Sequence, residues 1–67
     1  MKILSKASKK NCSARLFEIT KNKLNYVVIE FYKKGVLILH LEFSALLQNK
    51  AFSMYDTLIN ENKLIRE

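Results

Sequence analysis

The side chains of this sequence that could carry out chemistry are few and stand far apart. With one histidine, His40, and one cysteine, Cys12, neither a structural zinc site nor an internal disulfide is expected. Glu18 and Glu42 flank Tyr26 in the expected sheet, but two strand spacings of ~4.8 Å keep these carboxylates about 10 Å apart. Only one glycine is present, which excludes a glycine-rich phosphate loop.

His40 lies in the middle of an expected strand, with no second histidine and no cysteine near it. This setting favours a partly buried, hydrogen-bonded histidine over a general base or a metal ligand. A small ribonuclease-like activity, with His40 beside a basic patch, is the enzymatic alternative. Cys12 is interpreted as a small apolar residue rather than a reactive thiol. We therefore expect a protein without catalytic activity, cofactor or small-molecule substrate.

Positive charge is concentrated in the first half of the chain. Residues 1–35 hold nine lysines and arginines against two glutamates, whereas residues 36–67 hold three against four acidic residues. Such asymmetry indicates a side that faces a polyanion, although solubility alone also accounts for a charge of this size. The sequence shows neither a secretory signal nor a run of ~20 apolar residues, so we expect a cytoplasmic protein without membrane contact.

The residues that must be positioned belong to a β-hairpin between residues 24 and 43. Two runs rich in β-branched and aromatic residues flank Lys33-Lys34-Gly35, which predicts a three-residue turn with Gly35 in the left-handed conformation. Pairing Tyr32 with Val36 places only apolar side chains on one face of the hairpin. These odd-numbered side chains are Val27, Ile29, Phe31, Leu37, Leu39, Leu41 and Phe43.

A strand over residues 13–20 precedes the hairpin, joined to it by an expected three-residue turn, Lys21-Asn22-Lys23. With Thr20 opposite Leu24, Phe17 and Ile19 join the apolar face, and Leu16 and Glu18 join the mixed face. The agreement of three strands predicts an antiparallel meander.

The pattern after Phe43 changes to a helical period. Ser44 is a plausible N-cap, and a helix is expected from about Ala45 to about Leu64, with a break near Ala51–Ser53 as the alternative. The fold class is therefore α+β: a three-stranded antiparallel β-meander with a C-terminal helix on one face. A core this small supplies roughly 3–5 kcal/mol, so we also expect a homodimer.

Residues 1–12 are predicted to form a basic, flexible arm beside a single domain that spans residues 13–67. The arm and the second expected turn meet at one end of the sheet and bring a set of cationic side chains together around an aromatic one. This candidate nucleic-acid-binding set is Lys6, Lys9, Lys10, Arg15, Lys33, Lys34 and Tyr32. Lysines also protect exposed sheet edges from aggregation, and that alternative remains open.

The mixed sheet face is a second candidate surface, because it is too apolar to be purely solvated. Its expected contact residues are Tyr26, Val28, Ile38 and His40. A second copy of the chain, a larger protein, or unstacked bases on Tyr26 and Tyr32 are the partners considered.

The order of three strands and a helix resembles, in layout only, the half-units of dimeric single-stranded nucleic-acid-binding proteins of the Pur type. No stretch of residues matches a motif of that family, so no functional position is carried over. The leading hypothesis is a small regulatory protein that binds DNA or RNA through phosphate contacts from the arm and the hairpin lysines. The alternative is a protein-interaction module, of the phage or plasmid type, that inhibits or adapts a larger protein through the mixed face.

Overall fold

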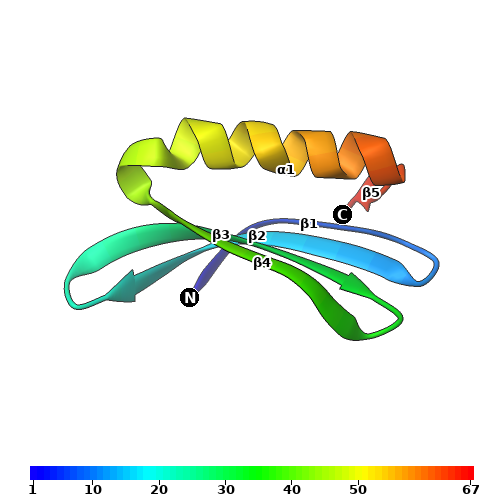
Figure 1. The fold of residues 1–67 in the computed structure, drawn as a ribbon, viewed down its shortest axis with the longest axis horizontal. Helices are drawn as coiled ribbons and strands as arrows, with labels where there is room; N and C mark the ends of the chain where they lie inside the picture. Colours follow the sequence, from blue (N-terminus) through cyan, green and yellow to red (C-terminus); the bar gives the residue numbers. More distant parts are fainter.

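A five-stranded antiparallel sheet and one C-terminal helix make up the fold, in a computed structural model that describes all residues 1–67 (Figure 1). The α+β class and the C-terminal position of the helix are confirmed, but the sheet has five strands rather than three. The elements in chain order are β1 (Lys2–Lys9), β2 (Cys12–Lys21), β3 (Leu24–Lys33), β4 (Val36–Ser44), a 3-10 turn η1 (Ala45–Leu47), α1 (Gln48–Asn62) and β5 (Ile65–Arg66).

The first of the additional strands is β1, in the segment for which a flexible arm was expected. Its partner is β2, in a sheet of order β4-β3-β2-β1-β5. Ala7 is 1% exposed and lies opposite Ala14, which is 3% exposed, so two small apolar residues let this strand pack under the helix. Lys2, Lys6 and Lys9 make this segment read as polar, which concealed the strand and its buried Ala7.

The turn between β2 and β3 has two residues rather than the expected three. Asn22 and Lys23 both have positive φ, +50° and +67°, as the type I′ hairpin turn requires. Lys21 therefore pairs with Leu24, and the register of β2 shifts by one residue from the expected one. This shift exchanges the two faces of β2. Leu16 faces the helix, while Phe17 lies on the opposite face of the sheet.

The β3–β4 hairpin also has a two-residue turn, Lys34-Gly35, with φ of +52° and +79°. Lys33, not Tyr32, pairs with Val36. A bulge at Ile38 then restores the expected parity, so that Phe31 lies opposite Leu39. The predicted apolar face of the hairpin is therefore correct from Leu39 onwards, although each residue has a different partner from the one expected.

The helix α1 is unbroken and begins later than expected, after η1. Ser44 acts as the predicted cap, because its Oγ accepts a hydrogen bond from the N–H of Leu46 at 3.3 Å. At the other end Lys63 adopts the left-handed conformation and its N–H bonds to the carbonyl of Asn60, which stops the helix. At 15 residues, α1 is too short and too polar to cross a lipid bilayer.

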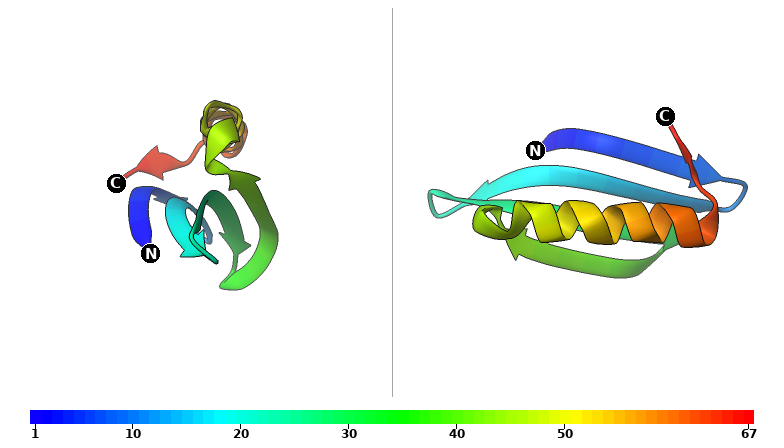
Figure 2. Two further views of the ribbon diagram at one scale, coloured as in Figure 1. Left: turned by 90° about the vertical axis from the view of Figure 1, so that its left-hand side faces the viewer. Right: turned by 90° about the horizontal axis from the view of Figure 1, so that it is seen from above.

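The core lies between α1 and one face of the sheet. Figure 2 shows the helix running along the strands on one side of a strongly twisted sheet. The buried stripe of α1 consists of Ala51, Tyr55 and Ile59, whereas the neighbouring Met54 remains 39% exposed. Tyr55 is 1% exposed and its hydroxyl donates to Ser5 Oγ at 3.2 Å, so its polar end is satisfied. The buried core residues are Ala7, Ala14, Leu16, Val27, Ile29, Phe31, Ala51, Tyr55, Ile59 and Leu64.

Candidate functional site

Two hairpin turns lie side by side at one end of the sheet. The β1–β2 turn and the β3–β4 turn meet there (Figure 1), and the N–H of Lys34 donates to the carbonyl of Asn11 at 2.7 Å. This backbone hydrogen bond joins the two turns across the end of β2. It gathers four exposed lysines, which we call the basic end: Lys9, Lys10, Lys33 and Lys34.

None of the lysines of the basic end forms an ion pair. Lys9 and Lys33 flank Cys12 from the two neighbouring strands, and Lys10 and Lys34 occupy the turns themselves. Lys10 and Lys34 also line a hollow of about 500 Å³, together with Ser8, Asn11, Cys12, Ser13 and Gly35. Four ammonium groups without an ion-pair partner, two of them lining a polar hollow, give this end of the sheet a positive electrostatic potential.

A second hollow, of about 240 Å³, adjoins the first one at Ser13, which lines both. Lys6, Arg15 and Tyr32 contribute to its wall, and Glu67 supplies one acidic group. Residues predicted for nucleic-acid binding therefore line two neighbouring hollows, with Lys9 and Lys33 beside them. The geometric prediction that Lys33 and Lys34 lie near the lysines of residues 6–10 is confirmed, although strand β1 carries those lysines.

The sheet face turned away from the helix, here called the outer face, carries a continuous polar network. Glu30 is the only buried charged residue, at 7% exposure. Its Oε1 accepts hydrogen bonds from Arg15 Nε at 2.7 Å and from the Tyr32 hydroxyl at 3.0 Å. Its Oε2 lies 2.8 Å from His40 Nδ1.

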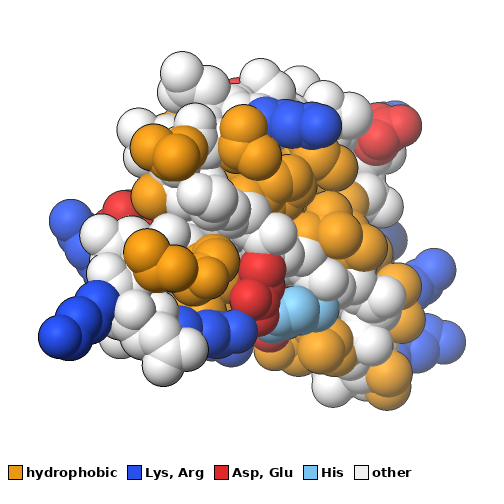
Figure 3. Space-filling model, turned by 60° about the vertical axis from the view of Figure 1, so that its left-hand side comes forward, with side chains coloured by type: hydrophobic (Ala, Val, Ile, Leu, Met, Phe, Trp, Pro, Cys, Tyr) orange, Lys and Arg blue, Asp and Glu red, His pale blue; other side chains and the backbone are white.

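The network continues from His40 to the edge of the sheet. His40 Nε2 lies 2.9 Å from Glu42 Oε2, and Lys21 Nζ donates to Glu42 Oε1 at 2.8 Å. Figure 3 shows the pale blue histidine against acidic side chains, with apolar groups above and beside them. Every buried polar side-chain atom has a hydrogen-bond partner. The charged groups of the outer face are therefore paired with one another, although the side chains of His40, Lys21 and Arg15 remain partly exposed.

Both ring nitrogens of His40 face carboxylate oxygens, which can only accept hydrogen bonds when ionised. Hydrogen bonds to Glu42 and Glu30 raise the pKa of His40 above its usual value and outweigh the opposing effect of desolvation. The arrangement therefore favours an imidazolium that donates from both nitrogens. A general base needs a free nitrogen lone pair, and the network leaves His40 none.

The pKa of Glu30 is set by opposing effects. Burial is the largest single influence and raises the pKa, but hydrogen bonds from His40, Arg15 and Tyr32 together outweigh it and lower the pKa below its usual value. Glu42 also has a lowered pKa, because Lys21 and His40 both donate to its carboxylate. The network thus holds two carboxylates ionised among three cations, which are Arg15, His40 and Lys21.

Cationic side chains also cover the aromatic residues of the outer face. The Arg15 guanidinium lies 4.7 Å from the centre of the Phe17 ring and 5.9 Å from that of Tyr32. Lys21 Nζ lies 5.7 Å from the Tyr26 ring centre. Phe17 is only 5% exposed although it lies on the face that the helix leaves free. Side chains within the sheet therefore supply much of the cover that was expected from a partner.

The four residues predicted for the mixed interaction face do not form one open surface. Val28 is fully buried, Tyr26 is half-buried, and His40 belongs to the polar network. Ile38 is 57% exposed, but it sits at the bulge of the edge strand β4.

Neither a metal nor a reactive-thiol site stands out. No group of three or more histidine, cysteine, aspartate or glutamate side chains is placed to hold a metal ion. Cys12 is a free thiol, half-buried against the core, as its interpretation as a small apolar residue implies.

Sequence reasoning missed Glu30, Glu42 and Lys21 as members of one network. A usable signal was present, because a glutamate within the apolar run of β3 needs cationic neighbours on both adjacent strands. Arg15 and His40 supply them in the observed register, in which each lies directly opposite Glu30. The one-residue error in β2 placed Arg15 on the other face and concealed the cluster.

Comparisons of the chain with protein-family models, with curated proteins and with solved structures found no match.

Proposed function

We propose that this is a small, non-enzymatic, cytoplasmic nucleic-acid-binding protein that contacts phosphate groups through its basic end. The observation that carries the proposal is the backbone hydrogen bond between Lys34 and Asn11, which holds two lysine-bearing turns together. Four free ammonium groups at one end of a small sheet offer several phosphate contacts at once. Phosphate contacts carry little sequence information, so limited sequence specificity is expected.

The outer face supports the same proposal through its charge. Taken alone, Glu30 and Glu42 repel phosphate, but each is paired with cations within the network. With His40 protonated, three cations face two carboxylates, so this region is not negative overall. A nucleic-acid strand bound at the basic end can therefore continue past Tyr32 without meeting an uncompensated acidic surface.

The proposal is tested by fluorescence anisotropy with labelled single- and double-stranded oligonucleotides of DNA and RNA. The variant Lys33→Glu/Lys34→Glu is expected to bind at least about tenfold more weakly, because it removes two phosphate contacts and adds repulsion. The matched control is Lys23→Glu/Lys50→Glu, which changes the net charge equally with two exposed lysines away from the basic end. Equal losses in both variants, or no binding by the natural sequence, would contradict the proposal.

A protein-interaction module remains the second candidate function, and one observation favours it. Val36, Leu37 and Ile38 are 60%, 46% and 57% exposed at the start of the edge strand β4, where they form an apolar surface. Capture of one stoichiometric protein partner that is insensitive to Lys33→Glu/Lys34→Glu would support this function over nucleic-acid binding.

We further propose that the protein acts as a homodimer. Only 13 of its 67 residues are buried, and large apolar side chains remain exposed along β4 and beyond its end. Small domains commonly supplement such a core by association.

A further inference from the structure

The strand β4 has a free edge, which the bulge at Ile38 protects only near its start. The strand order β4-β3-β2-β1-β5 leaves one side of β4 without a partner. At the opposite edge, β1 is partly covered by β5, and the N–H of Glu67 bonds to the Lys6 carbonyl. Natural edge strands are usually blunted by lysine or proline, and β4 contains neither. The chemistry of this edge therefore fits another β-strand.

Exposed apolar side chains lie at both ends of β4. Val36 and Ile38 stand near its start, and Leu46 and Leu47 follow its end with 94% and 53% exposure. A single chain leaves all four in water.

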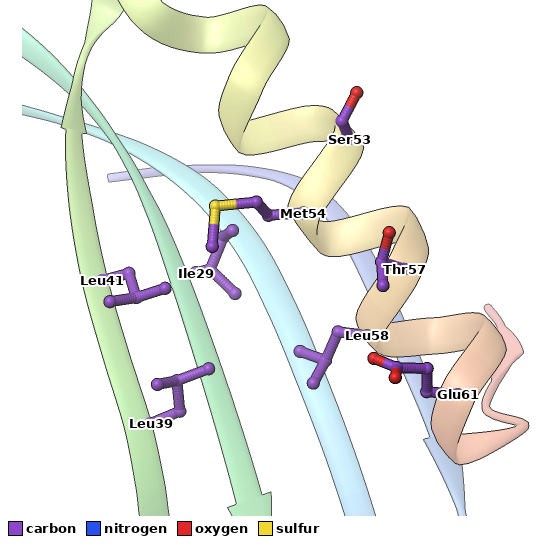
Figure 4. A pocket seen from close by; sticks show the side chains of 8 residues that line it. All are labelled: Ile29, Leu39, Leu41, Ser53, Met54, Thr57, Leu58 and Glu61. Carbon is purple, nitrogen blue, oxygen red and sulfur yellow. The ribbon is translucent and has the colours of Figure 1, made fainter.

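An apolar groove runs between β4 and α1 (Figure 4). It has a volume of about 300 Å³. Leu39 and Leu41 point into it from the strand, and Met54 and Leu58 point into it from the helix. The helix packs mainly over β3 and leaves the helix-facing Leu39 and Leu41 of β4 half-buried.

We propose that two copies of the chain pair antiparallel through β4 about a two-fold axis at Leu41. In this register Leu39 lies opposite Phe43 of the second copy, and His40 lies opposite its Glu42. Apolar groups thus meet apolar groups on the helix side, and unlike charges meet on the outer face. The pattern from Leu39 to Phe43 reads the same way from both ends, as an isologous contact requires.

Neighbouring registers are less favourable. An axis at His40 or at Glu42 places two like charges directly opposite each other. An axis between two residues sets apolar side chains against charged ones. The bulge at Ile38 breaks the alternation of β4, which restricts regular pairing to the segment after it.

The proposed register also accounts for the exposed apolar side chains. Regular pairing about Leu41 ends with Ile38 of one copy beside Ser44 of the other, so the exposed Val36 and Leu46 approach each other just beyond the paired segment. The two-fold axis stands perpendicular to the sheet, so both helices lie on the same face and the two grooves face each other. Leu39, Leu41, Met54 and Leu58 of both copies then form one apolar interior.

A second copy suits this edge better than an unrelated strand, because the match of charge and hydrophobicity is internal to the β4 sequence. The inference rests on the proposed homodimer and is independent of nucleic-acid binding. It predicts a continuous ten-stranded sheet in which the basic ends of the two copies point in opposite directions along the strands.

The test is the oligomeric state of the full chain, measured by sedimentation and light scattering over a concentration series. Ile38→Lys and Leu46→Lys are expected to raise the dimer dissociation constant by roughly tenfold or more, because each removes buried apolar area from the interface. The control is Ile65→Lys, which changes an exposed apolar residue of β5 at the opposite edge of the sheet and should leave the constant unchanged. Circular dichroism identifies any variant that fails to fold.

Hydrogen exchange provides a second measurement that needs no variant. Amides on the free edge of β4 are expected to become more protected as the concentration of the natural chain rises. A dimer that survives both Ile38→Lys and Leu46→Lys, without protection of β4, would overturn this interface and leave the proposed homodimer standing. A chain that stays monomeric at about 1 mM would overturn both the interface and the homodimer. This holds even if a strand of a different protein is found to pair with β4.

Discussion

Glu30 shows how the sequence accommodates a charge inside a small sheet. The Glu30 side chain is 10% exposed, and its carboxylate accepts hydrogen bonds from Arg15, Tyr32 and His40. Three donors therefore offset the cost of removing this carboxylate from water. Loss of one donor leaves a buried acceptor unsatisfied, which costs about 1–3 kcal/mol. Glu30 therefore ties β2, β3 and β4 together through polar rather than apolar contacts.

The protonation of His40 links this network to pH. Since the folded-state pKa of His40 is raised, its contribution to stability is fully present below the unfolded-state pKa of about 6.5 and is lost as pH rises through the folded-state value. The lowered pKa values of Glu30 and Glu42 act in the opposite sense, so their contribution is lost as pH falls below about 4.5. Maximum thermal stability is expected between about pH 5 and 6.5.

Thermal unfolding followed by circular dichroism from pH 4 to pH 9 tests this expectation. The Tm of the natural chain should decline above about pH 6.5, whereas His40→Gln should show no decline attributable to this site. Nuclear magnetic resonance titration of the His40 ring provides the direct control. A ring that titrates at or below about 6.5 would contradict the assignment of His40 as an imidazolium in the network.

At the scale of elements, the hairpin turns determine which face each strand presents. Lys23 and Lys34 adopt positive φ without being glycine or asparagine, which costs about 1–2 kcal/mol per residue, whereas Asn22 tolerates this conformation better. The strands tolerate this cost because a two-residue type I′ turn matches their twist. Turn length, rather than strand propensity, thus decides that Leu16 is buried against the helix.

Substitution in the turns should change stability in opposite directions. Lys23→Gly is expected to stabilise the fold by about 0.5–1 kcal/mol, because glycine adopts the required φ without strain. Gly35→Ala is expected to destabilise it by about 1 kcal/mol. No atom lies within 4 Å of a Cβ added at Gly35, so the backbone conformation, not a clash, causes the loss.

Urea unfolding measured on the two turn variants and the natural chain gives these free energies. Gly35→Asn serves as a control, since asparagine tolerates the left-handed region better than alanine and should lose less stability. A neutral Gly35→Ala would show that the turn does not hold the observed conformation.

The sequence predicts the β3–β4 hairpin, the Ser44 cap and the C-terminal helix because each depends on a local pattern. Alternation identifies the helix-facing side of β3 and, from Leu39 onwards, of β4 correctly, whereas the bulge at Ile38 leaves Leu37 on the other face, opposite Tyr32. Turn length is not encoded as clearly, since Lys21-Asn22-Lys23 reads equally well as a three-residue turn, and a one-residue error reverses every side chain of β2. That reversal also removes Arg15 from Glu30, so the outer network could not be found before the register was known.

At the scale of the whole molecule, the fold places positive charge at one end of an elongated body. The principal dimensions are 37 × 21 × 19 Å, and the basic end occupies one extremity of the long axis (Figure 1). Charges separated by more than a Debye length of about 8 Å act nearly independently at physiological salt. The lysines near the β2–β3 turn, at the other extremity, therefore contribute little to a ligand held at the basic end.

The most direct measurement of the central claim is the salt dependence of oligonucleotide binding. We expect log K for single-stranded DNA to fall linearly with log salt, and the slope to shrink by about 0.7 for each lysine of the basic end replaced by alanine. Lys10→Ala and Lys34→Ala should each show this change, and Lys23→Ala should not. A slope that is unaffected by Lys10 and Lys34, or that responds equally to Lys23, would contradict the assignment of the basic end as the nucleic-acid interface.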